Sequence, residues 1–61
     1  MKQKAANDLT IREAAEMVGV TEHTVRSWVQ ADRFPTYRSV RRRIIEREPF
    51  IAWAKAENLL Q

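Results

Sequence analysis

A lone glycine between two helix-like stretches constrains the fold of this 61-residue chain more than any other feature. Before Gly19, four apolar residues have the i, i+3, i+4, i+7 spacing of one buried helical face. They are Ile11, Ala14, Ala15 and Val18. Because glycine adopts a left-handed backbone at little cost, Gly19 is expected to end that helix and to turn the chain.

A threonine marks the start of each of these two helices. Thr10 and Glu13 fit the S/T-x-x-E capping box, in which both side chains satisfy exposed backbone N–H groups. Thr21 is a good N-cap for a second helix that runs to about residue 31. The buried stripe of that helix consists of Val25, Trp28 and Val29. Two helices joined by a short turn that contains glycine are the signature of a helix-turn-helix.

Length and composition exclude several classes of function. A chain of this size forms one domain that buries only about 60% of its unfolded surface, which leaves no room for an enclosed catalytic cavity. With no cysteine and a single histidine, His23, neither a disulfide nor a metal site is expected. No apolar run approaches the roughly 18 residues of a membrane span. We therefore expect a cytoplasmic, non-enzymatic protein with no cofactor, no small-molecule ligand and no membrane partner.

Basic residues are concentrated after the second helix. The net charge is only +3, yet the segment 33–45 holds five arginines and no acidic residue. They are Arg33, Arg38, Arg41, Arg42 and Arg43. Clustered arginine in a small domain suggests a polyanionic partner, although a run of charge at a hairpin tip also has the simpler role of a solubilising surface.

The segment 36–45 predicts a β-hairpin. Tyr37 and the isoleucines at 44–45 favour strands on either side of a polar centre, which places the tip near residues 39–41. A two-residue turn normally needs Asn-Gly or Asp-Gly, and Val40 is ill suited to a positive φ. The sequence therefore predicts a longer, looser loop that becomes ordered on binding. On a strand, Arg41 and Arg43 would share one side and Arg42 would take the other.

A third helix is predicted from about Arg47 to Leu60. Pro49 fits its first turn, and Phe50 and Trp53 mark its buried face. The predicted fold is mainly α with a small β-hairpin, a winged helix-turn-helix. It spans residues 9–60 and follows a flexible polar tail over residues 1–8, whose lysines are expected to be solvated.

The same residues resemble a known family. The runs LTIREAA from Leu9, Gly19-Val20-Thr21 and Thr24-Val25-Arg26, with Trp28, resemble the winged helix-turn-helix of MerR-type regulators and, still more, that of small phage and transposon excisionases. The continuation is similar too, with Phe34-Pro35, Tyr37-Arg38, an arginine-rich wing, Ile45 and Trp53. The resemblance covers roughly residues 9–53. It implies a non-enzymatic protein that bends double-stranded DNA and cooperates with an integrase and with further copies of itself.

Two positions depart from the pattern of that family. Relatives commonly have glycine in the wing turn, where this chain has Val40. Excisionases often carry several basic residues on the recognition helix, whereas Ser27 and Gln30 here flank a lone Arg26. The resemblance therefore implies a base readout that depends less on arginine than is usual.

Physical argument assigns the DNA contacts. In helix-turn-helix proteins the N-terminal part of the second helix meets base edges in the major groove. The residues expected there are Thr21, His23, Thr24, Arg26, Ser27 and Gln30. Arg26 suits guanine, Gln30 suits adenine and the Thr24 methyl suits thymine. Wing contacts to the backbone or a minor groove are expected from Arg38, Arg41, Arg42 and Arg43, and phosphate contacts from Thr10 and Arg12.

Other functions stay open from the sequence. A small MerR-like transcriptional regulator is the close alternative, although such regulators add a long dimerisation helix that is not found here. A protein-interaction module would dock on an integrase or regulator through the third helix, Leu59 and Leu60. An enzyme lacks a catalytic constellation, and an RNA-binding protein would need exposed aromatic platforms. We expect a monomer in solution that associates along DNA.

Overall fold

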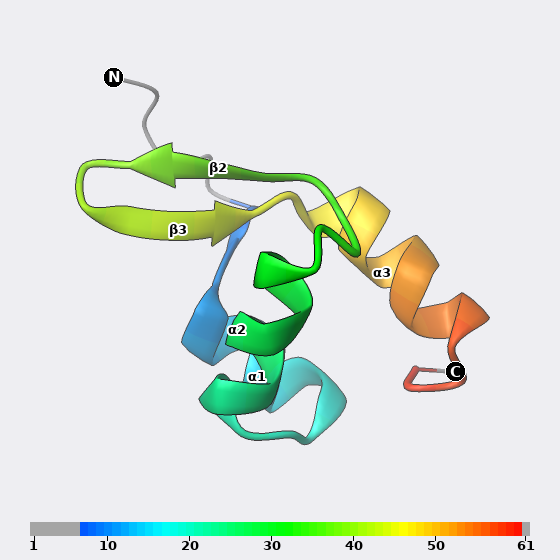
Figure 1. The fold of residues 1–61 in the computed structure, drawn as a ribbon. Coiled ribbons are helices and arrows are strands. Elements are labelled where there is room, and N and C mark those ends of the chain that lie inside the picture. The colour runs from blue at the N-terminus through cyan, green and yellow to red at the C-terminus, as the bar shows by residue number, and fades with distance from the viewer. Residues whose placement is uncertain (1–6, 61) are drawn as a thin grey trace.

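The computed structural model describes residues 7–60, so the predicted tail lies largely outside the described residues. The elements, in chain order, are β1 (Leu9–Thr10), α1 (Ile11–Val18), α2 (Glu22–Gln30), β2 (Thr36–Ser39), β3 (Arg42–Ile45) and α3 (Arg47–Ala56). The β2–β3 hairpin projects past α1 and α2 on one side of the molecule, and α3 lies toward the other (Figure 1). The predicted order of two helices, a hairpin and a closing helix is confirmed.

The capping box and the glycine turn have the predicted geometry. The Thr10 amide donates to Glu13 Oε1 at 2.8 Å, and the Glu13 amide donates to Thr10 Oγ1 at 3.1 Å. Gly19 has φ +74°, the left-handed conformation that glycine adopts without strain, and α1 ends there. The turn lets α1 and α2 pack through small buried side chains, chiefly Ala14, Ala15 and Val25.

The sheet has three strands, whereas the sequence predicted a two-stranded hairpin. The strand order is β1-β3-β2, and all pairings are antiparallel. Leu9 lies opposite Ile45, and Thr10 lies opposite Ile44. The sequence-based prediction missed β1 because a strand of two residues shows no alternation, and its pairing depends on a strand far along the chain. This pairing fixes the start of α1 against the base of the hairpin.

The hairpin turn is tight, so the prediction of a longer, looser loop was wrong. Ser39 pairs with Arg42, which leaves only Val40 and Arg41 between the strands. Val40 takes φ +58°, a left-handed conformation that β-branched residues rarely adopt. The burial of Ile44 and Ile45, each no more than 1% exposed, sets the register of the hairpin. This register imposes a two-residue turn although Val40 is unfavourable in it.

An aromatic cluster joins α3 to the rest of the domain. The ring centroids of Phe34 and Phe50 lie 4.9 Å apart, and those of Phe34 and Trp53 lie 5.1 Å apart. Trp53 in turn meets Trp28 of α2 edge to face at 4.9 Å. Phe50 is fully buried, while both tryptophans are half-buried at the border of the core. The predicted inward orientation of the Trp28 stripe is therefore confirmed.

The closing helix is shorter than predicted. α3 ends at Ala56, not near Leu60, and Asn58 takes φ +62° in a left-handed turn. The Leu59 amide donates to the Ala54 carbonyl at 2.8 Å, and the Asn58 amide donates to the Lys55 carbonyl at 3.1 Å. This is the Schellman arrangement, which Asn supports where glycine is absent. Leu59 and Leu60 are consequently half-buried after the helix, not on its surface.

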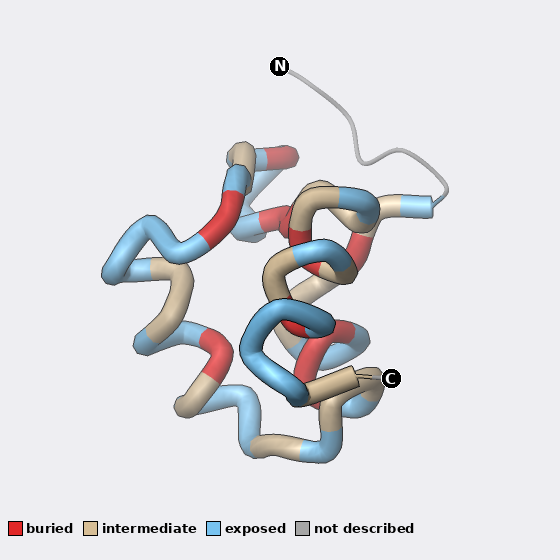
Figure 2. The backbone as a smooth tube through the Cα atoms, turned by 90° about the vertical axis from the view of Figure 1, so that its right-hand side faces the viewer, coloured by how far each residue is buried: buried red, intermediate tan, exposed pale blue. Residues whose placement is uncertain are grey.

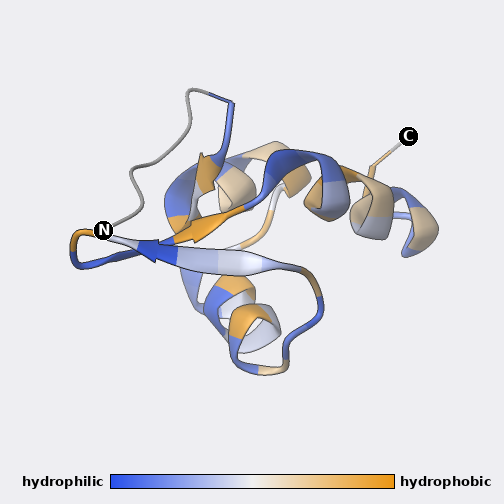
Figure 3. Cartoon of the chain, turned by 90° about the horizontal axis from the view of Figure 1, so that it is seen from above, coloured by the Kyte–Doolittle hydropathy of each residue, from blue (hydrophilic) through white to orange (hydrophobic). Residues whose placement is uncertain are grey.

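Asp8 is attached to the domain, although the sequence-based prediction placed it in the tail. Its carboxylate accepts hydrogen bonds from the Tyr37 hydroxyl at 2.5 Å and from the Arg47 amide at 3.2 Å. Tyr37 belongs to β2, and Arg47 begins α3. Buried residues gather on the inner faces of the helices and the base of the hairpin, and exposed residues occupy the outer turns (Figure 2). The hairpin is hydrophobic near its base and mostly hydrophilic farther out (Figure 3).

Candidate nucleic-acid interface

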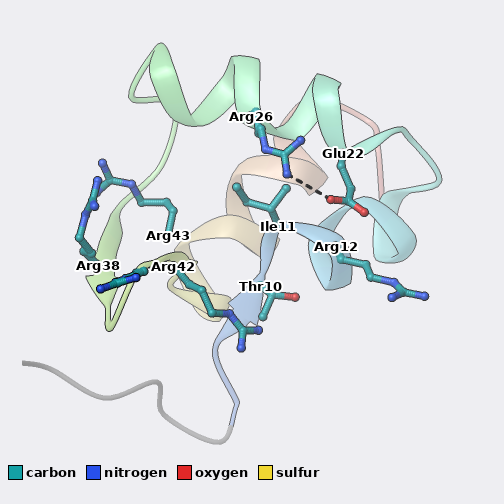
Figure 4. Close-up of a pocket in the computed structure, with 9 residues that line it drawn as sticks. Thr10, Ile11, Arg12, Glu22, Arg26, Arg38, Arg42 and Arg43 are labelled. Carbon is teal, nitrogen blue, oxygen red and sulfur yellow. Dashed lines mark hydrogen bonds and ion pairs between the residues drawn. The ribbon is translucent and has the colours of Figure 1, made fainter.

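A groove of about 470 Å³ separates the two helices of the motif from the hairpin. Its lining residues come from β1, α1, α2 and the hairpin, namely Thr10, Ile11, Arg12, Glu22, Arg26, Arg38, Arg41, Arg42 and Arg43. In Figure 4, Arg26 reaches from α2 toward Ile11 at the centre, with Arg38 and Arg43 on one side and Arg12 on the other. Six of the nine lining residues are arginines, so the groove is strongly positive.

Two arginines face α2 from the sheet. Arg38 and Arg43 are direct cross-strand partners, so their side chains share one face. Side chains alternate along a strand, so this face is also that of Ile45, which packs in the helical core. Like charges directly opposite each other destabilise a sheet. An anion bound between the two guanidinium groups would offset their repulsion. The pair is therefore arranged to receive negative charge.

The other two hairpin arginines have different positions. Arg42 lies opposite the buried Ser39 and so projects from the other face of β3. Arg41 belongs to the turn and not to a strand. The prediction that Arg41 and Arg43 share one side was therefore wrong, because it assumed that strand alternation extends to Arg41. All of these arginines are exposed, and within residues 7–60 the ion pairs of arginine are Arg12–Glu16 and Arg26–Glu22. No carboxylate in that range therefore forms an ion pair with a hairpin arginine.

The exposed face of α2 carries most of the predicted base-contacting residues. His23, Arg26, Ser27 and Gln30 are all exposed there. A second hollow of about 330 Å³ continues from the groove along α2 and is lined by Ile11, Arg26, Val29, Gln30, Asp32 and Arg43. Arg26 and Gln30 thus lie on the edge of α2 that faces the hairpin. His23 and Ser27 do not line either hollow and face outward.

Thr21 and Thr24 are engaged with each other at the start of α2. Thr21 Oγ1 accepts the Thr24 amide at 3.2 Å and lies 2.9 Å from Thr24 Oγ1. Thr24 is half-buried, so its methyl group is less accessible than the sequence led us to expect. The primary role of Thr21 in the free protein is to cap the helix.

Replacing Thr21 by alanine is expected to lower the free energy of unfolding by about 1 kcal/mol, because the Thr24 amide loses its acceptor. Thermal denaturation followed by circular dichroism measures the change. Thr21→Ser is the matched control, since it keeps the oxygen and is expected to unfold close to the native temperature. A Thr21→Ala protein as stable as Thr21→Ser would contradict the capping role.

Thr10 and Arg12 lie at the rim of the groove near the start of α1. The Thr10 hydroxyl accepts a hydrogen bond from the Glu13 amide, and its own proton can still be donated to a phosphate oxygen. Arg12 pairs loosely with Glu16 at 3.6 Å, and both side chains are more than two-thirds exposed. Such a pair contributes little to stability, so Arg12 is free to exchange its partner.

Glu22 is a lining residue that the sequence-based prediction missed. Its carboxylate receives Arg26 Nη2 at 3.4 Å, in the midst of the arginines. The available signal was the spacing, because Glu at i and Arg at i+4 pair on a helix surface. Ile11 and Asp32, which line the hollows, were also missed, and nothing in the sequence pattern marks them out.

Comparison with known proteins gives one family. A family model described as a helix-turn-helix domain matches residues 9–58. No curated protein and no solved structure matches the chain. The matched range includes all six elements and every residue that lines the two hollows. In the part of the chain that the structure describes, no helix has the length and apolarity to cross a membrane, and no cluster of side chains is suited to a metal ion.

Proposed function

The chain belongs to the helix-turn-helix domain family, and from that premise we propose that it is a non-enzymatic, sequence-specific DNA-binding protein. One observation supports this most strongly, namely that the exposed edge of α2 and the four arginines of the hairpin border the same groove. In helix-turn-helix proteins the second helix of the motif enters the major groove. With α2 there, the hairpin lies beside it as a wing.

The DNA strand between the major groove and the next minor groove is the proposed occupant of this groove. Its phosphates meet the cross-strand pair Arg38 and Arg43 on the sheet side and Arg12 on the α1 side. Arginine binds phosphate with two parallel hydrogen bonds, and each neutralised phosphate releases counterions into solution. These contacts position the protein on the duplex and carry no sequence information themselves.

Sequence readout is proposed to depend on Arg26. The side chains of Arg26 and Glu22 are 58% and 47% exposed, so their ion pair contributes less than about 1 kcal/mol. A bidentate contact from arginine to guanine O6 and N7 provides about 1–3 kcal/mol of discrimination. Arg26 can therefore leave Glu22 for guanine. The freed Glu22 carboxylate can then accept a hydrogen bond from the N4 amino group of cytosine. Because the same carboxylate repels phosphate, a complex in which Glu22 faces a base is favoured over one in which it faces the DNA backbone.

Selection of bound duplexes from a random pool, at two salt concentrations, tests this function. A sharp motif that includes guanine opposite Arg26 is the expected result. Arg26→Ala is expected to relax the preference at that position and to cost about 1–3 kcal/mol of specific binding. Arg33→Ala is the matched control, since Arg33 is exposed but lines neither hollow. No enrichment at either salt concentration would refute sequence-specific binding.

Within DNA binding, we propose that the protein acts as an excisionase, a recombination directionality factor of a phage or mobile element. The resemblance in its helix-turn-helix and hairpin residues supports this role, as does an arginine-rich wing able to grip bent DNA. Electrophoresis of circularly permuted site fragments, with and without the integrase of the same element, tests it. A bend together with cooperative binding of integrase is expected. A small MerR-like regulator would instead change promoter activity without affecting integrase.

A further inference from the structure

The tip of the hairpin carries an apolar residue in an unfavourable backbone conformation. Val40 is 60% exposed, and no other large hydrophobic residue in the range 7–60 is exposed to a comparable degree. Figure 3 shows a hydrophobic patch of colour in the turn at the end of the hairpin, next to hydrophilic strand ends. With φ +58°, Val40 stands where a glycine or asparagine would fit without strain. The fold therefore gains nothing from valine here, either in burial or in backbone energy.

The surroundings of Val40 indicate what its side chain could contact. Arg41 and Arg42 follow it directly, and Arg38 and Arg43 form the second cross-strand pair from the tip. None of the four arginines is in an ion pair within the described part of the chain. Exposure of the Val40 side chain to water is unfavourable, and the neighbouring arginines have no anionic partner within residues 7–60. Both the valine and the arginines would be satisfied by a partner that presents anionic groups at its rim and apolar groups between them.

From this we infer that Val40 is a wedge that enters the minor groove of duplex DNA and opens the base-pair step beneath it. The inference rests on the proposed DNA-binding function and adds to it a mechanism of bending. The minor groove is about 6 Å wide with phosphates along both rims, so the arginines grip the rims while the apolar tip meets sugars and base edges. Proteins that press apolar side chains between base steps kink the duplex by about 20–90° toward the major groove.

The shape of the hairpin fits this role. Only Val40 and Arg41 join β2 to β3, so the tip is narrow and presents one apolar side chain beyond the last paired residues, Ser39 and Arg42. A looser loop would have a broader tip and would lose conformational entropy when it became ordered on DNA. A valine is short, so it requires a step that opens easily. We therefore expect a pyrimidine–purine step, such as TA or CA/TG, under the wing, because these steps unstack at the lowest cost.

Two substitutions test the role of Val40 in bending DNA separately from its effect on the stability of the fold. Val40→Asn keeps the size of the side chain, removes its apolar character and relieves the left-handed strain. It is expected to unfold a few degrees above the native protein, to bind the selected site about tenfold more weakly and to bend it less. Val40→Leu retains an apolar tip and the strain. It is expected to keep the bend and the affinity while unfolding no higher than the native protein.

The DNA provides a second, independent readout. A mismatch that weakens stacking at the step under the wing lowers the cost of opening it. The native protein is expected to bind such a site more tightly than the intact site, and Val40→Asn is expected to show no such gain. Bend angles come from circularly permuted fragments or from fluorescence energy transfer between labelled ends.

The outcomes distinguish this inference from the function on which it rests. Equal bend angles for the native protein and Val40→Asn would overturn the wedge while leaving DNA binding intact. Loss of the bend in Val40→Leu would overturn it as well, because the apolar tip is then still present. Failure of the proposed function would appear differently, as a native protein that selects no duplex at all.

Discussion

Replacing Arg41, Arg42 and Arg43 together by alanine is expected to reduce affinity for duplex DNA by on the order of a hundredfold at physiological salt. All three line the groove and are exposed, and none has an ion-pair partner within residues 7–60. Their charge is therefore available to phosphate. The slope of log K against log salt is expected to fall by about 0.9 for each phosphate that the variant no longer neutralises. Titration by fluorescence anisotropy at several salt concentrations measures both quantities.

Two controls separate charge from structure in this experiment. Replacing the same three residues by lysine keeps the charge and is expected to restore most of the salt slope, but less of the affinity, because lysine cannot form bidentate phosphate contacts. Lys55→Ala removes an exposed charge from α3, away from the groove, and is expected to leave binding nearly unchanged. An alanine triple variant with native affinity and native salt slope would show that the hairpin does not meet DNA.

The parts of the fold that were predictable from sequence are those with local causes. The Thr10 capping box, the Gly19 turn and the Thr21 cap each depend on residues within four positions of one another, and the structure has all three. The parts that were missed depend on distant partners. β1 exists because Leu9 and Thr10 find the far strand β3, which no local pattern reveals.

At the hairpin and at the end of α3, local and global preferences compete. Val40 disfavours a two-residue turn, yet the buried pair Ile44 and Ile45 fixes a register that leaves no room for a longer one. Asn58 ends α3 through a left-handed turn, a signal that the sequence contained but that the apolar Leu59 and Leu60 obscured. A prediction from periodicity alone extends helices through such residues.

The same distinction applies to the candidate site. Helical periodicity was sufficient to place His23, Arg26 and Ser27 on the exposed face of α2. It could not place Glu22 in the groove, because that depends on how the hairpin packs beside α2. Nor could it locate Arg41, whose position changes with turn length. Which of these residues touches DNA stays a prediction, since exposure permits contact and does not establish it.

The second large effect is expected from the core. Phe50→Ala removes a fully buried ring that packs against Phe34 and Trp53, and such substitutions cost about 3–5 kcal/mol. A domain of this size starts near the low end of the usual range of about 5–15 kcal/mol, so most of its stability is lost. Thermal denaturation is expected to show a broad transition at a much lower temperature. Phe50→Leu keeps most of the volume and is expected to cost less than about 1.5 kcal/mol.

This substitution also tests whether α3 supports the recognition helix. Phe50 contacts Trp53, and Trp53 meets Trp28 on the inner side of α2, so losing Phe50 loosens the face opposite the groove. Because the native state alone binds the selected duplex, DNA at about 100 times its Kd adds about 2.7 kcal/mol of stability. Phe50→Ala should therefore regain helical circular dichroism when that duplex is added, whereas a scrambled duplex should restore much less. If the variant unfolds within a few degrees of the native protein, α2 does not depend on the aromatic cluster, and the orientation of its outer face must be set by α1 and the sheet alone.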